Sequence, residues 1–434
     1  MNDLSFGFPE VSMAKDDIIA TYYIETDSSD ILKYVVAIAE EQTTSTWTAV
    51  PGEHEKIRRK HTGKVVAVYA LPDYEFVVPK EEINRKYVVQ IAFPSINFDP
   101  QIPMLLSSVI GNIAQIPYLK LMDIAFPESW IGGFKGPKFG IEGIRDLLGV
   151  KERPFVNNMI KPDIGWTPEE GANMAYEVAL GGGDFIKDDE LLPGNPVYCP
   201  LEDRIKAIMA AIKRADEETG EKTLYTPNIT DDISKLKDNA YRAIDAGANA
   251  LMMNFYTIGF SAAKMIAEDP NINVPIMAHI DFSGTTFGSP YQGISSPLLV
   301  GKLARMCGAD MQIITSPYGK FPVVKSKCQQ QVLMARQELF GIKPMLPLLS
   351  GGMTQGAVPQ TMKELGTDIC LAAGGAIHGH PMGATAGAKS MRQAIEATMQ
   401  GVSLGEYAKE HKELAAIVDS WGKEDVSEYF DLKK

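Results

Sequence analysis

The sequence lacks the features that mark secreted, disulfide-linked or membrane-embedded proteins. It has four cysteines in 434 residues, and no two of them form a CxxC pair. This pattern is typical of a reducing compartment and excludes both a disulfide framework and a cysteine-based zinc site. No uninterrupted apolar run approaches the ~20 residues of a membrane span. The first residues also lack the basic segment and apolar run of a signal peptide. We therefore expect a cytoplasmic protein with no membrane partner.

Positive charge is scarce as well. The chain has 42 lysines and arginines against 55 aspartates and glutamates, which leaves a formal net charge of −13. Nucleic acids and anionic membranes bind basic surfaces, so we expect neither as a partner. An anionic small molecule is still compatible with this charge, because a few local lysines and backbone N–H groups suffice to bind it.

The chain divides near residue 130. Before that point, strand-like runs at 18–24, 65–70 and 87–92 and a helical stretch at 28–41 predict a small α+β, ferredoxin-like domain over residues 1–130. The segment 127–140 is rich in glycine and proline and indicates a connection. Residues 131–434 then form the second domain.

In the second domain, short apolar runs alternate with amphipathic helical stretches. The helical stretches include 168–180, 200–218, 232–246 and 297–307, and the apolar runs are 155–160, 184–186, 223–227, 250–255, 275–279, 311–315, 345–349 and 369–373. Eight strands joined by helices predict a (β/α)8 barrel. The main competitor, an open doubly wound sheet, usually has a glycine-rich turn after its first strand. Here KPDIGW follows that strand, which favours the barrel.

Barrel enzymes place their chemistry where the strands end. The second apolar run is followed by KDDE, residues 187–190, directly after three glycines. Such a charge run is often only solvated, but its place at a strand end favours a cation site. Crowded carboxylates repel one another unless a cation neutralises them, and oxygen ligands suit Mg²⁺. Carbamylation of Lys187 by CO2 would make it a third anionic oxygen ligand.

Three further strand ends carry ionisable side chains. Lys161 ends the first run, and it is either a proton-transfer group with a depressed pKa or an exposed lysine at the rim. His279 ends the fifth run and is either a substrate-binding or proton-transfer group or a buried structural histidine. Lys320 follows the sixth run on a Gly-Lys loop that could close over a substrate.

Paired glycines follow the last two strands. The seventh run ends in Ser350-Gly351-Gly352 and the eighth in Gly374-Gly375. Glycines allow backbone N–H groups to approach a phosphate, so both pairs favour the phosphate site common in barrels. For His378 and His380, just beyond the second pair, we expect a structural role, because neither cysteine nor carboxylate ligands lie near them.

Together these motifs resemble the RuBisCO large-chain superfamily. GGGDFIKDDE resembles the family signature, in which the lysine is carbamylated and binds Mg²⁺ with the following Asp and Glu. The resemblance implies that Lys187, Asp189 and Glu190 are the metal ligands and that Asp188 is not. It covers nearly the whole chain and implies a homodimer, or a higher oligomer, whose active sites are shared between subunits.

Other motifs extend the resemblance residue by residue. EEQTTSTWTAV resembles the N-terminal motif that reaches the partner subunit's active site, VIGNIA resembles the motif of the active-site asparagine, and IKPDIG, LLSGGM and AAGGAIHGHPMGA resemble motifs at the strand ends. The substrate- and phosphate-binding residues that these motifs imply are Glu41, Thr46, Trp47, Asn112, Ser350, Gly351, Gly352, Gly374 and Gly375, with Lys161 as a catalytic residue.

The departures from the family pattern are equally informative. True carboxylases have a second lysine where this chain has Asp163, and they have an arginine and two histidines where it has Ile280, Ser283 and Ile313. In carboxylases the lost arginine and histidine bind the second phosphate of a bisphosphate. The resemblance therefore implies a form IV, RuBisCO-like protein that does not carboxylate and that acts on a phosphorylated small molecule with one phosphate.

The activity that the resemblance implies is Mg²⁺-dependent enolisation of a sugar or oxo-acid monophosphate through a metal-stabilised enolate, by an isomerase, tautomerase or decarboxylase. Lys161 is the candidate for proton transfer, with His279 as the second choice, and Lys320 would cover the substrate or hold its carboxylate. An authentic carboxylase, a non-catalytic scaffold and a metal-dependent barrel aldolase are alternatives. Retention of the metal ligands argues against the scaffold, and the N-terminal motif against the aldolase.

A further alternative is 2,3-diketo-5-methylthiopentyl-1-phosphate enolase of methionine salvage. The chain shares TLYTPNIT, VPIMAH, CGAD and SPYG with these enolases. They have a lysine as base where this chain has Asn112, and they lack a loop lysine equivalent to Lys320. Both differences argue against this assignment.

Overall fold

The computed structural model describes residues 16–46, 48 and 50–418. The chain divides into two compact units. The N-terminal unit contains the residues up to Phe134 together with the later segment Phe282–Leu299, and the barrel unit contains Lys135–Asp281 and the residues from Val300 onward. Within the described ranges, no helix combines the length and apolar character that crossing a membrane requires.

The N-terminal unit is built on a five-stranded sheet in the order β10-β4-β1-β3-β2. Strand β1 pairs antiparallel with both β3 and β4, and β2 pairs antiparallel with β3. Its elements are β1 (Ile18–Thr26), α1 (Ile31–Glu41), α2 (Glu55–His61), β2 (Lys64–Leu71), β3 (Arg85–Phe93), η2 (Ser95–Asn97), α3 (Ile102–Ile110), η3 (Asn112–Gln115), β4 (Leu119–Ala125), α4 (Glu128–Ile131), α11 (Gly284–Phe287) and β10 (Gly293–Ile294).

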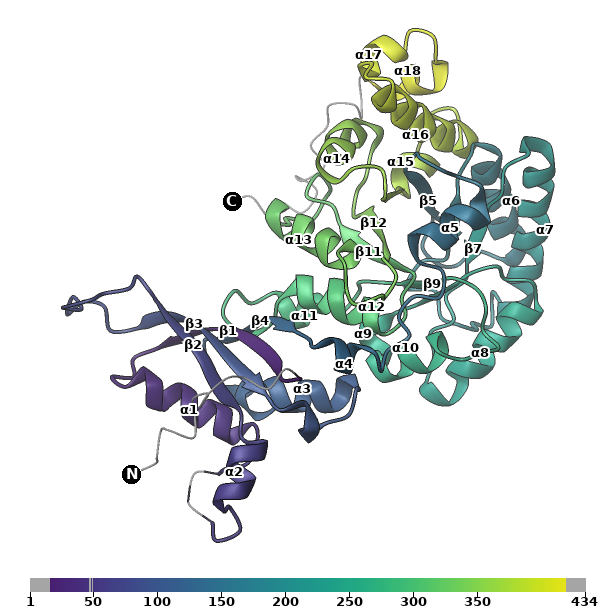
Figure 1. Cartoon of the computed structure of the whole chain (residues 1–434). Helices are drawn as coiled ribbons and strands as arrows, with labels where there is room; N and C mark the ends of the chain where they lie inside the picture. The colour runs from purple at the N-terminus through teal and green to yellow at the C-terminus, as the bar shows by residue number, and fades with distance from the viewer. Residues whose placement is uncertain (1–15, 47, 49, 419–434) are drawn as a thin grey trace. The chain divides into compact units, whose positions relative to one another are not determined.

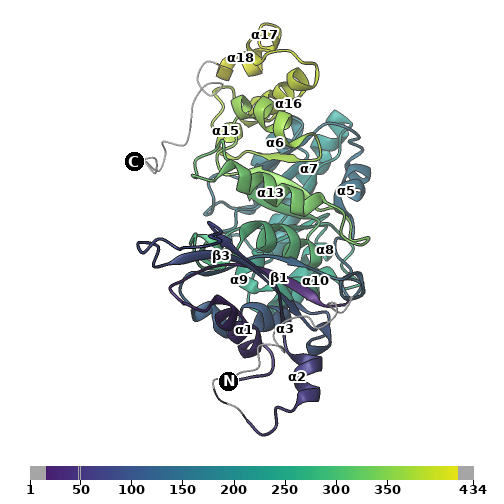
Figure 2. The same cartoon turned by 60° about the vertical axis from the view of Figure 1, so that its left-hand side comes forward.

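Alternation along the strands explains how this sheet acquires its core. In β1, Ile18, Ala20, Tyr22 and Ile24 are buried, and the residues between them are partly exposed. Figures 1 and 2 show α1 and α3 on the same face of the sheet. The predicted antiparallel sheet is thus confirmed, while β4 and α3 are elements that the sequence pattern did not predict.

The later segment, 282–299, joins this sheet. Its short strand β10 pairs parallel with β4. Lys120 of β4 donates from Nζ to the backbone carbonyl oxygens of Phe287, at 3.0 Å, and of Ser289. A segment that lies between two strands of the barrel in sequence therefore extends the sheet of the other unit.

The barrel unit contains eight parallel strands in the order β7-β6-β5-β13-β12-β11-β9-β8. Backbone bonds from Ile229 to Met252 and from Met252 to Pro227 connect the two outermost strands. The strands are β5 (Phe155–Met159), β6 (Phe185–Lys187), β7 (Leu224–Thr226), β8 (Leu251–Met253), β9 (Ile276–Ala278), β11 (Met311–Thr315), β12 (Leu346–Ser350) and β13 (Cys370–Ala372). All eight predicted runs are strands, and the predicted barrel is confirmed.

Helices surround these strands (Figure 1). They are α5 (Gly140–Leu148), α6 (Pro168–Leu180), α7 (Leu201–Thr219), α8 (Ile233–Asp245), α9 (Phe255–Ile258), α10 (Phe260–Ala267), η4 (Pro297–Leu303), α12 (Ala304–Met306), α13 (Lys325–Arg336), η5 (Gln355–Ala357), α14 (Val358–Leu365), α15 (Gly375–His378), α16 (Ala384–Met399), α17 (Leu404–Tyr407) and α18 (Lys412–Val418). Helix α6 begins at a capping box in which Thr167 and Glu170 bond reciprocally, with Pro168 as its first residue.

The barrel interior is a packed apolar core. Phe155 of β5 and Phe185 of β6 lie edge to face with ring centroids 5.6 Å apart. Helix α5 contributes Ile141, Ile144 and Leu148 to the same core cluster, and it lies near the N-terminal ends of the strands, where the backbone of Ile141 bonds to Pro344. With this end filled, a binding site has room only at the other end, where the strands finish.

Candidate functional site

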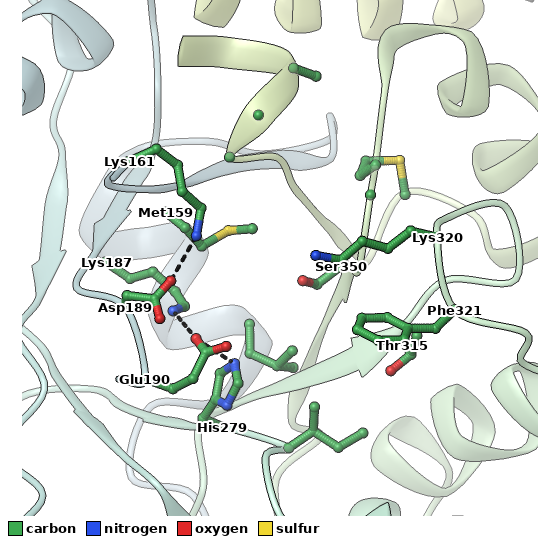
Figure 3. A pocket seen from close by; sticks show the side chains of 18 of the residues that line it. Met159, Lys161, Lys187, Asp189, Glu190, His279, Thr315, Lys320, Phe321 and Ser350 are labelled. Atoms are coloured by element: carbon green, nitrogen blue, oxygen red, sulfur yellow. Dashed lines mark hydrogen bonds and ion pairs between the residues drawn. The ribbon is translucent and has the colours of Figure 1, made fainter. Parts of the chain in front are cut away.

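A cavity of about 410 Å³ opens at the C-terminal ends of the barrel strands (Figure 3). Every site residue that the sequence predicts within the barrel unit lines it. These residues are Lys161, Lys187, Asp189, Glu190, His279, Lys320, Ser350, Gly351, Gly352, Gly374 and Gly375. Residues from six different strand ends therefore meet in one place, as the barrel topology predicts.

The KDDE segment supplies three of these side chains. Lys187 is the last residue of β6, and Asp188 to Glu190 continue the chain beyond the strand. The side chain of Lys187 is 1% exposed, and its Nζ donates to the backbone oxygen of Asp188 at 2.7 Å and lies 3.2 Å from Glu190 Oε2. Successive side chains of extended backbone point to opposite sides, so Lys187 and Asp189 both face the cavity while Asp188 faces away.

Lys161 lies beside this segment. Its Nζ donates to Asp189 Oδ2 at 2.7 Å and to Asp163 Oδ1. Burial disfavours the ammonium, but the two carboxylates outweigh it and raise the pKa of Lys161. The same ion pair outweighs burial at Asp163 and lowers the pKa of its carboxyl. In the structure, Lys161 is thus a paired cation at the cavity wall.

The two cavity carboxylates differ in their titration. Burial, together with repulsion from Glu190, raises the pKa of Asp189. Burial acts in the same direction on Glu190, but the ammonium of Lys187 and the ring of His279 hold its pKa at about 2. Two adjacent carboxylates that share a small number of cations are the arrangement from which a divalent ion can be bound.

His279 follows β9 and lies beside Glu190 in the cavity lining. Its Nε2 lies 3.1 Å from Glu190 Oε2, and its Nδ1 lies 3.0 Å from Asp281 Oδ1. The backbone N–H of Asp281 also points to Nδ1, at 3.1 Å. Two carboxylates therefore orient one imidazole, which presents its edge to the cavity.

The two glycine pairs, after β12 and after β13, also line the cavity. Gly351 and Gly352 have φ values of +88° and +105°, a region that side-chain-bearing residues rarely adopt. A Cβ on Gly374 would lie 2.9 Å from Lys161 Cε. At Gly351, Gly352 and Gly374, a side chain would thus strain the backbone or crowd Lys161, and both glycine pairs line the cavity.

Figure 3 shows Lys320, Phe321 and Ser350 on the side of the cavity opposite the charged cluster. The backbone N–H of Lys320 donates to Gly351 O at 2.7 Å, which ties the loop after β11 to the loop after β12. The Nζ of Lys320 lies 5.3 Å from the centroid of the Phe321 ring. This loop carries both a cation and an aromatic wall.

Much of the remaining wall is apolar. Met159, Ile280, Ile313 and Met353 line the cavity, and Ile313 and Met353 are each only 2% exposed. Sequence reasoning singled out the two isoleucines as departures from the family pattern, but it missed both methionines and the Phe321 ring. The position of Met159 next to the end of the predicted run 155–160 was the available signal, since strand ends form the mouth of a barrel.

The predicted residues of the N-terminal unit form a separate group. Glu41 ends α1 and Asn112 begins η3, and Asn112 Nδ2 donates to Glu41 Oε1 at 3.3 Å. Thr46 lies exposed in the segment that follows α1. Trp47, the fourth residue predicted here, lies outside the described residues. Two residues that the sequence separates by 71 positions are thus paired.

Carboxylates, histidines and cysteines by themselves do not form a metal site in the described part of the chain, where no group of three or more is arranged to hold an ion. Of the three carboxylates of the KDDE segment, those of Asp189 and Glu190 line the cavity. His378 and His380 do not converge on a common point: His378 Nε2 lies 3.0 Å from Asn158 Oδ1, and His380 Nε2 lies 2.9 Å from Glu413 O.

Comparisons with known proteins agree with these motifs. Residues 140–421 match the family model of the ribulose bisphosphate carboxylase large chain, catalytic domain, and residues 7–130 match that of its N-terminal domain. A ribulose bisphosphate carboxylase-like protein of Archaeoglobus fulgidus is 49% identical over 93% of each chain. A 2,3-diketo-5-methylthiopentyl-1-phosphate enolase of Geobacillus thermodenitrificans is 38% identical over 93% of this chain and 98% of its own.

The fold gives the same result. The crystal structure of a rubisco-like protein (MtnW) from Alicyclobacillus acidocaldarius superposes with a TM-score of 0.87 at 33% identity, covering 94% of this chain and all of that one. Both family models, the relatives and the barrel-end motifs therefore lead to one conclusion: the chain belongs to the RuBisCO large-chain family, as a RuBisCO-like protein of form IV.

Proposed function

We propose that this protein is a non-carboxylating, Mg²⁺-dependent enzyme that forms an enolate from a sugar or oxo-acid monophosphate, by isomerisation, tautomerisation or decarboxylation. One observation carries the proposal. The retained ligand set, two ionisable side chains and both glycine pairs line the same cavity as Ile280 and Ile313. The groups proposed for enolisation line one cavity, and Ile280 and Ile313 stand there at positions where carboxylases have an arginine and a histidine for a second phosphate.

The donor set fits Mg²⁺. Lys187, Asp189 and Glu190 would hold the ion after Lys187 reacts with CO2, because the carbamate replaces a buried cation with an anionic oxygen ligand beside two carboxylates. When bound, the ion supplies Lewis-acid polarisation of a substrate carbonyl. A lysine that kept its ammonium would be the wrong neighbour for such an ion, so the proposal requires CO2 as well as Mg²⁺.

The preference for a substrate with one phosphate follows from the residues that line the cavity. Backbone N–H groups at Gly351, Gly352, Gly374 and Gly375 suit one phosphate. A second phosphate would face Ile280 and Ile313, and burying a dianion against apolar side chains costs on the order of several kcal/mol. We therefore assign a monophosphate substrate.

Two side chains are candidates for moving the substrate proton. Lys161 holds its proton between Asp163 and Asp189, and His279 is oriented by Glu190 and Asp281. Lys320 lies across the cavity from both (Figure 3), where its ammonium can cover the substrate or pair with a substrate carboxylate. Variants Lys161→Met and His279→Asn separate the two roles, since only loss of the proton-transfer group abolishes solvent exchange at the α-carbon.

We also propose a homodimer with shared active sites. The family motif that reaches a partner's site includes Glu41, Thr46 and Asn112, and the pairing of Glu41 with Asn112 supports a joint role for these residues. Mixing an inactive Lys187→Ala chain with an inactive Glu41→Ala chain should then restore part of the activity, because one hybrid site is intact. A protein that is monomeric in light scattering and fully active would contradict this proposal.

The activity is tested by screening phosphorylated ketoses and oxo-acids for exchange of α-protons in deuterated water, by NMR, with Mg²⁺ and bicarbonate. We expect exchange or decarboxylation of at least one monophosphate and no incorporation of labelled CO2 into ribulose bisphosphate. Lys187→Arg is the matched control, because it keeps the positive charge and cannot form the carbamate. If no monophosphate reacts while Mg²⁺ is demonstrably bound, the proposal is wrong.

The enolase reaction of methionine salvage is a second candidate. It is favoured by the enolases to which this chain is 37–38% identical over almost their whole length. Two residues argue against it: those enolases have a lysine in place of Asn112, and they have no equivalent of Lys320. Including 2,3-diketo-5-methylthiopentyl-1-phosphate in the screen decides between the two, since rapid enolisation of this compound alone would establish the narrower activity.

A further inference from the structure

A second charged cluster is buried next to the cavity, but none of its residues lines the cavity. It is centred on Asp188, the one residue of the KDDE segment that faces away. Asp188, Arg204 of α7 and Tyr225 of β7 all have no exposed surface. The proposed function does not use these three residues, although they adjoin the segment that carries all three proposed ligands.

Every oxygen of the Asp188 carboxylate is engaged. Oδ1 accepts from the hydroxyl of Tyr225 at 2.6 Å, and Oδ2 accepts from Arg204 Nε at 3.0 Å and from the backbone N–H of Asn228 at 2.9 Å. The backbone N–H of Asp188 donates to Thr226 O at 3.3 Å. Four bonds, to α7, to β7 and to the loop after β7, fix both the side chain and the backbone of this residue.

The network continues to the end of the ligand segment. Arg204 Nη2 donates to the carbonyl of Asn228 at 2.9 Å. The amide of Asn228 donates in turn to the carbonyls of Glu190, at 3.3 Å, and of Leu192, at 3.0 Å. Asn254 Nδ2 donates to the same Glu190 carbonyl at 3.0 Å. The backbone from residue 188 to residue 192 is thus held from behind at several points.

Fixing Asp188 also fixes the neighbouring side chains that face the cavity. In extended backbone, the side chains of Lys187 and Asp189 leave the chain opposite to that of Asp188. Any rotation of Asp188 about the chain therefore turns both neighbours. A buried apolar residue could fill the same volume, but it would not fix an orientation, whereas directional bonds to a charged group do.

We propose that Asp188, held by Arg204 and Tyr225, is a positioning residue that sets the direction in which Lys187, Asp189 and Glu190 point, without touching ion or substrate. The inference rests on the proposed function, because it assigns a role toward the Mg²⁺ that those three residues would hold. Partners behind metal ligands commonly change metal affinity when they are removed, by about 10- to 100-fold.

The same strand supplies a matched control. Asp184 lies just before β6, is 2% exposed and pairs with Arg153 through two bonds of 2.7 Å. It also accepts from the backbone N–H of Val156 at 2.8 Å. Asp184→Asn and Asp188→Asn therefore each break an ion pair of a buried aspartate, at opposite ends of one strand, although Arg153 is 15% exposed and Arg204 is fully buried.

A milder pair of variants avoids the risk that Asp188→Asn does not fold. Tyr225→Phe removes one hydroxyl and leaves the pair of Asp188 and Arg204 in place. Tyr22→Phe is its control, because Tyr22 is also fully buried and donates to a backbone carbonyl, that of Val109 at 2.5 Å, in the N-terminal unit.

The experiment uses the full chain with Mg²⁺ and ¹³C-labelled bicarbonate as probes. Calorimetry gives the Mg²⁺ affinity, ¹³C NMR reports the carbamate, and thermal unfolding shows that each variant is folded. We expect Tyr225→Phe and Asp188→Asn to lower the Mg²⁺ affinity by about tenfold or more and to weaken the carbamate signal. Asp184→Asn and Tyr22→Phe should lower the melting temperature without changing either readout.

Two outcomes overturn the inference. Wild-type affinity and carbamate in Tyr225→Phe and in folded Asp188→Asn would show that the network does not position the ligands. Equal losses of affinity in the test variants and their controls would show a general effect of stability. Absence of Mg²⁺ binding and of carbamate in the wild type is a different result, since it refutes the metal site of the proposed function itself.

Discussion

The two ends of strand β6 carry charged residues in opposite arrangements. Before the strand, Asp184 pairs with Arg153 through two short bonds and accepts a backbone N–H, so each charge meets its own partner. At and just beyond the other end of the strand, Lys187, Asp189 and Glu190 crowd around a cavity, and repulsion from Glu190 helps to raise the pKa of Asp189. Only two residues, Phe185 and Ile186, separate the fully paired Asp184 from the crowded side chains that begin at Lys187.

The other strands of the barrel show the same difference between their N-terminal and C-terminal ends. Near the N-terminal ends of the strands, Asp310 accepts three backbone N–H groups, from Phe139, Gly140 and Ile276, at 2.7–2.9 Å. Arg145 there pairs with Asp368 at 2.7 Å. At the C-terminal ends, one side chain serves several partners, as Lys161 does between two carboxylates. Charges at the first end stabilise the fold, and charges at the second end are available to a ligand.

The largest effect should come from the crowded end. We expect Lys187→Ala to lower Mg²⁺-dependent α-proton exchange by about 10³-fold or more, because a bound ion contributes several kcal/mol to stabilising developing charge. The melting temperature should stay near that of the wild type, because a buried ammonium is itself costly. Exchange kinetics and thermal unfolding check these two expectations. An unchanged rate of α-proton exchange would contradict the view that the crowded charges after β6 serve a ligand.

The next largest effect should come from the paired end. Removing one partner of a buried ion pair leaves the other uncompensated, so we expect Asp184→Asn to lower the free energy of unfolding by about 3 kcal/mol. Urea unfolding of the full chain measures this. Activity per folded molecule should remain that of the wild type, and a specific loss of activity would show that the two ends are not independent.

A glycine pair sharpens the comparison further. Gly351 at the cavity has φ +88°, and a Cβ there would lie 3.1 Å from Phe321 Cδ2 and 3.2 Å from Thr315 Cγ2. Alanine should displace the local N–H groups and weaken inorganic phosphate binding by about tenfold, since a residue forced into this region costs roughly 1–2 kcal/mol.

The matched control for that variant is Gly247→Ala. Gly247 has φ +106° with nothing within 4 Å of an added Cβ, and it lies between α8 and the start of β8. It should lose similar stability while phosphate affinity, measured by calorimetry, stays unchanged. Equal loss of phosphate affinity in both variants would remove Gly351 from the proposed phosphate site.

The smallest effect concerns pH. Asp269 lies between α10 and β9, where Lys237 above all, the N–H of Asn271 and Tyr241 hold its pKa at about 2, below its ordinary value. A depressed pKa stabilises the fold above the unfolded pKa, near 3.9, and this contribution is lost as pH falls toward 2. Compared with Asp269→Asn, the wild type should gain about 1 kcal/mol near pH 7.

That gain should disappear between about pH 4 and pH 2, the interval between the two pKa values. Urea midpoints measured across this range give the result. A constant difference between wild type and variant would mean that Asp269 is not ionised preferentially in the folded state.

The sequence predicted the barrel well because its strands are buried on both faces and therefore stand out as short apolar runs. Helix α6 has the predicted bounds, 168–180, and the structure shows the reason: Thr167 and Glu170 cap its start and glycines follow its end. Strand β10 is different. It has two residues, its pairing with β4 depends on a contact far away in sequence, and no local pattern marks it.

The sequence by itself also determined which residue types stand at the strand ends, and with them the chemistry that the cavity can offer. Only the tertiary structure decided which of two neighbouring residues faces the cavity and which is buried in a hydrogen-bond network. Asp188 and Asp189 are adjacent and identical in type, yet one is bonded to Arg204 and Tyr225, 16 and 37 residues further along the chain, and the other faces the cavity. Side-chain direction follows from what packs against each face of the chain, and those partners come together only when the barrel closes.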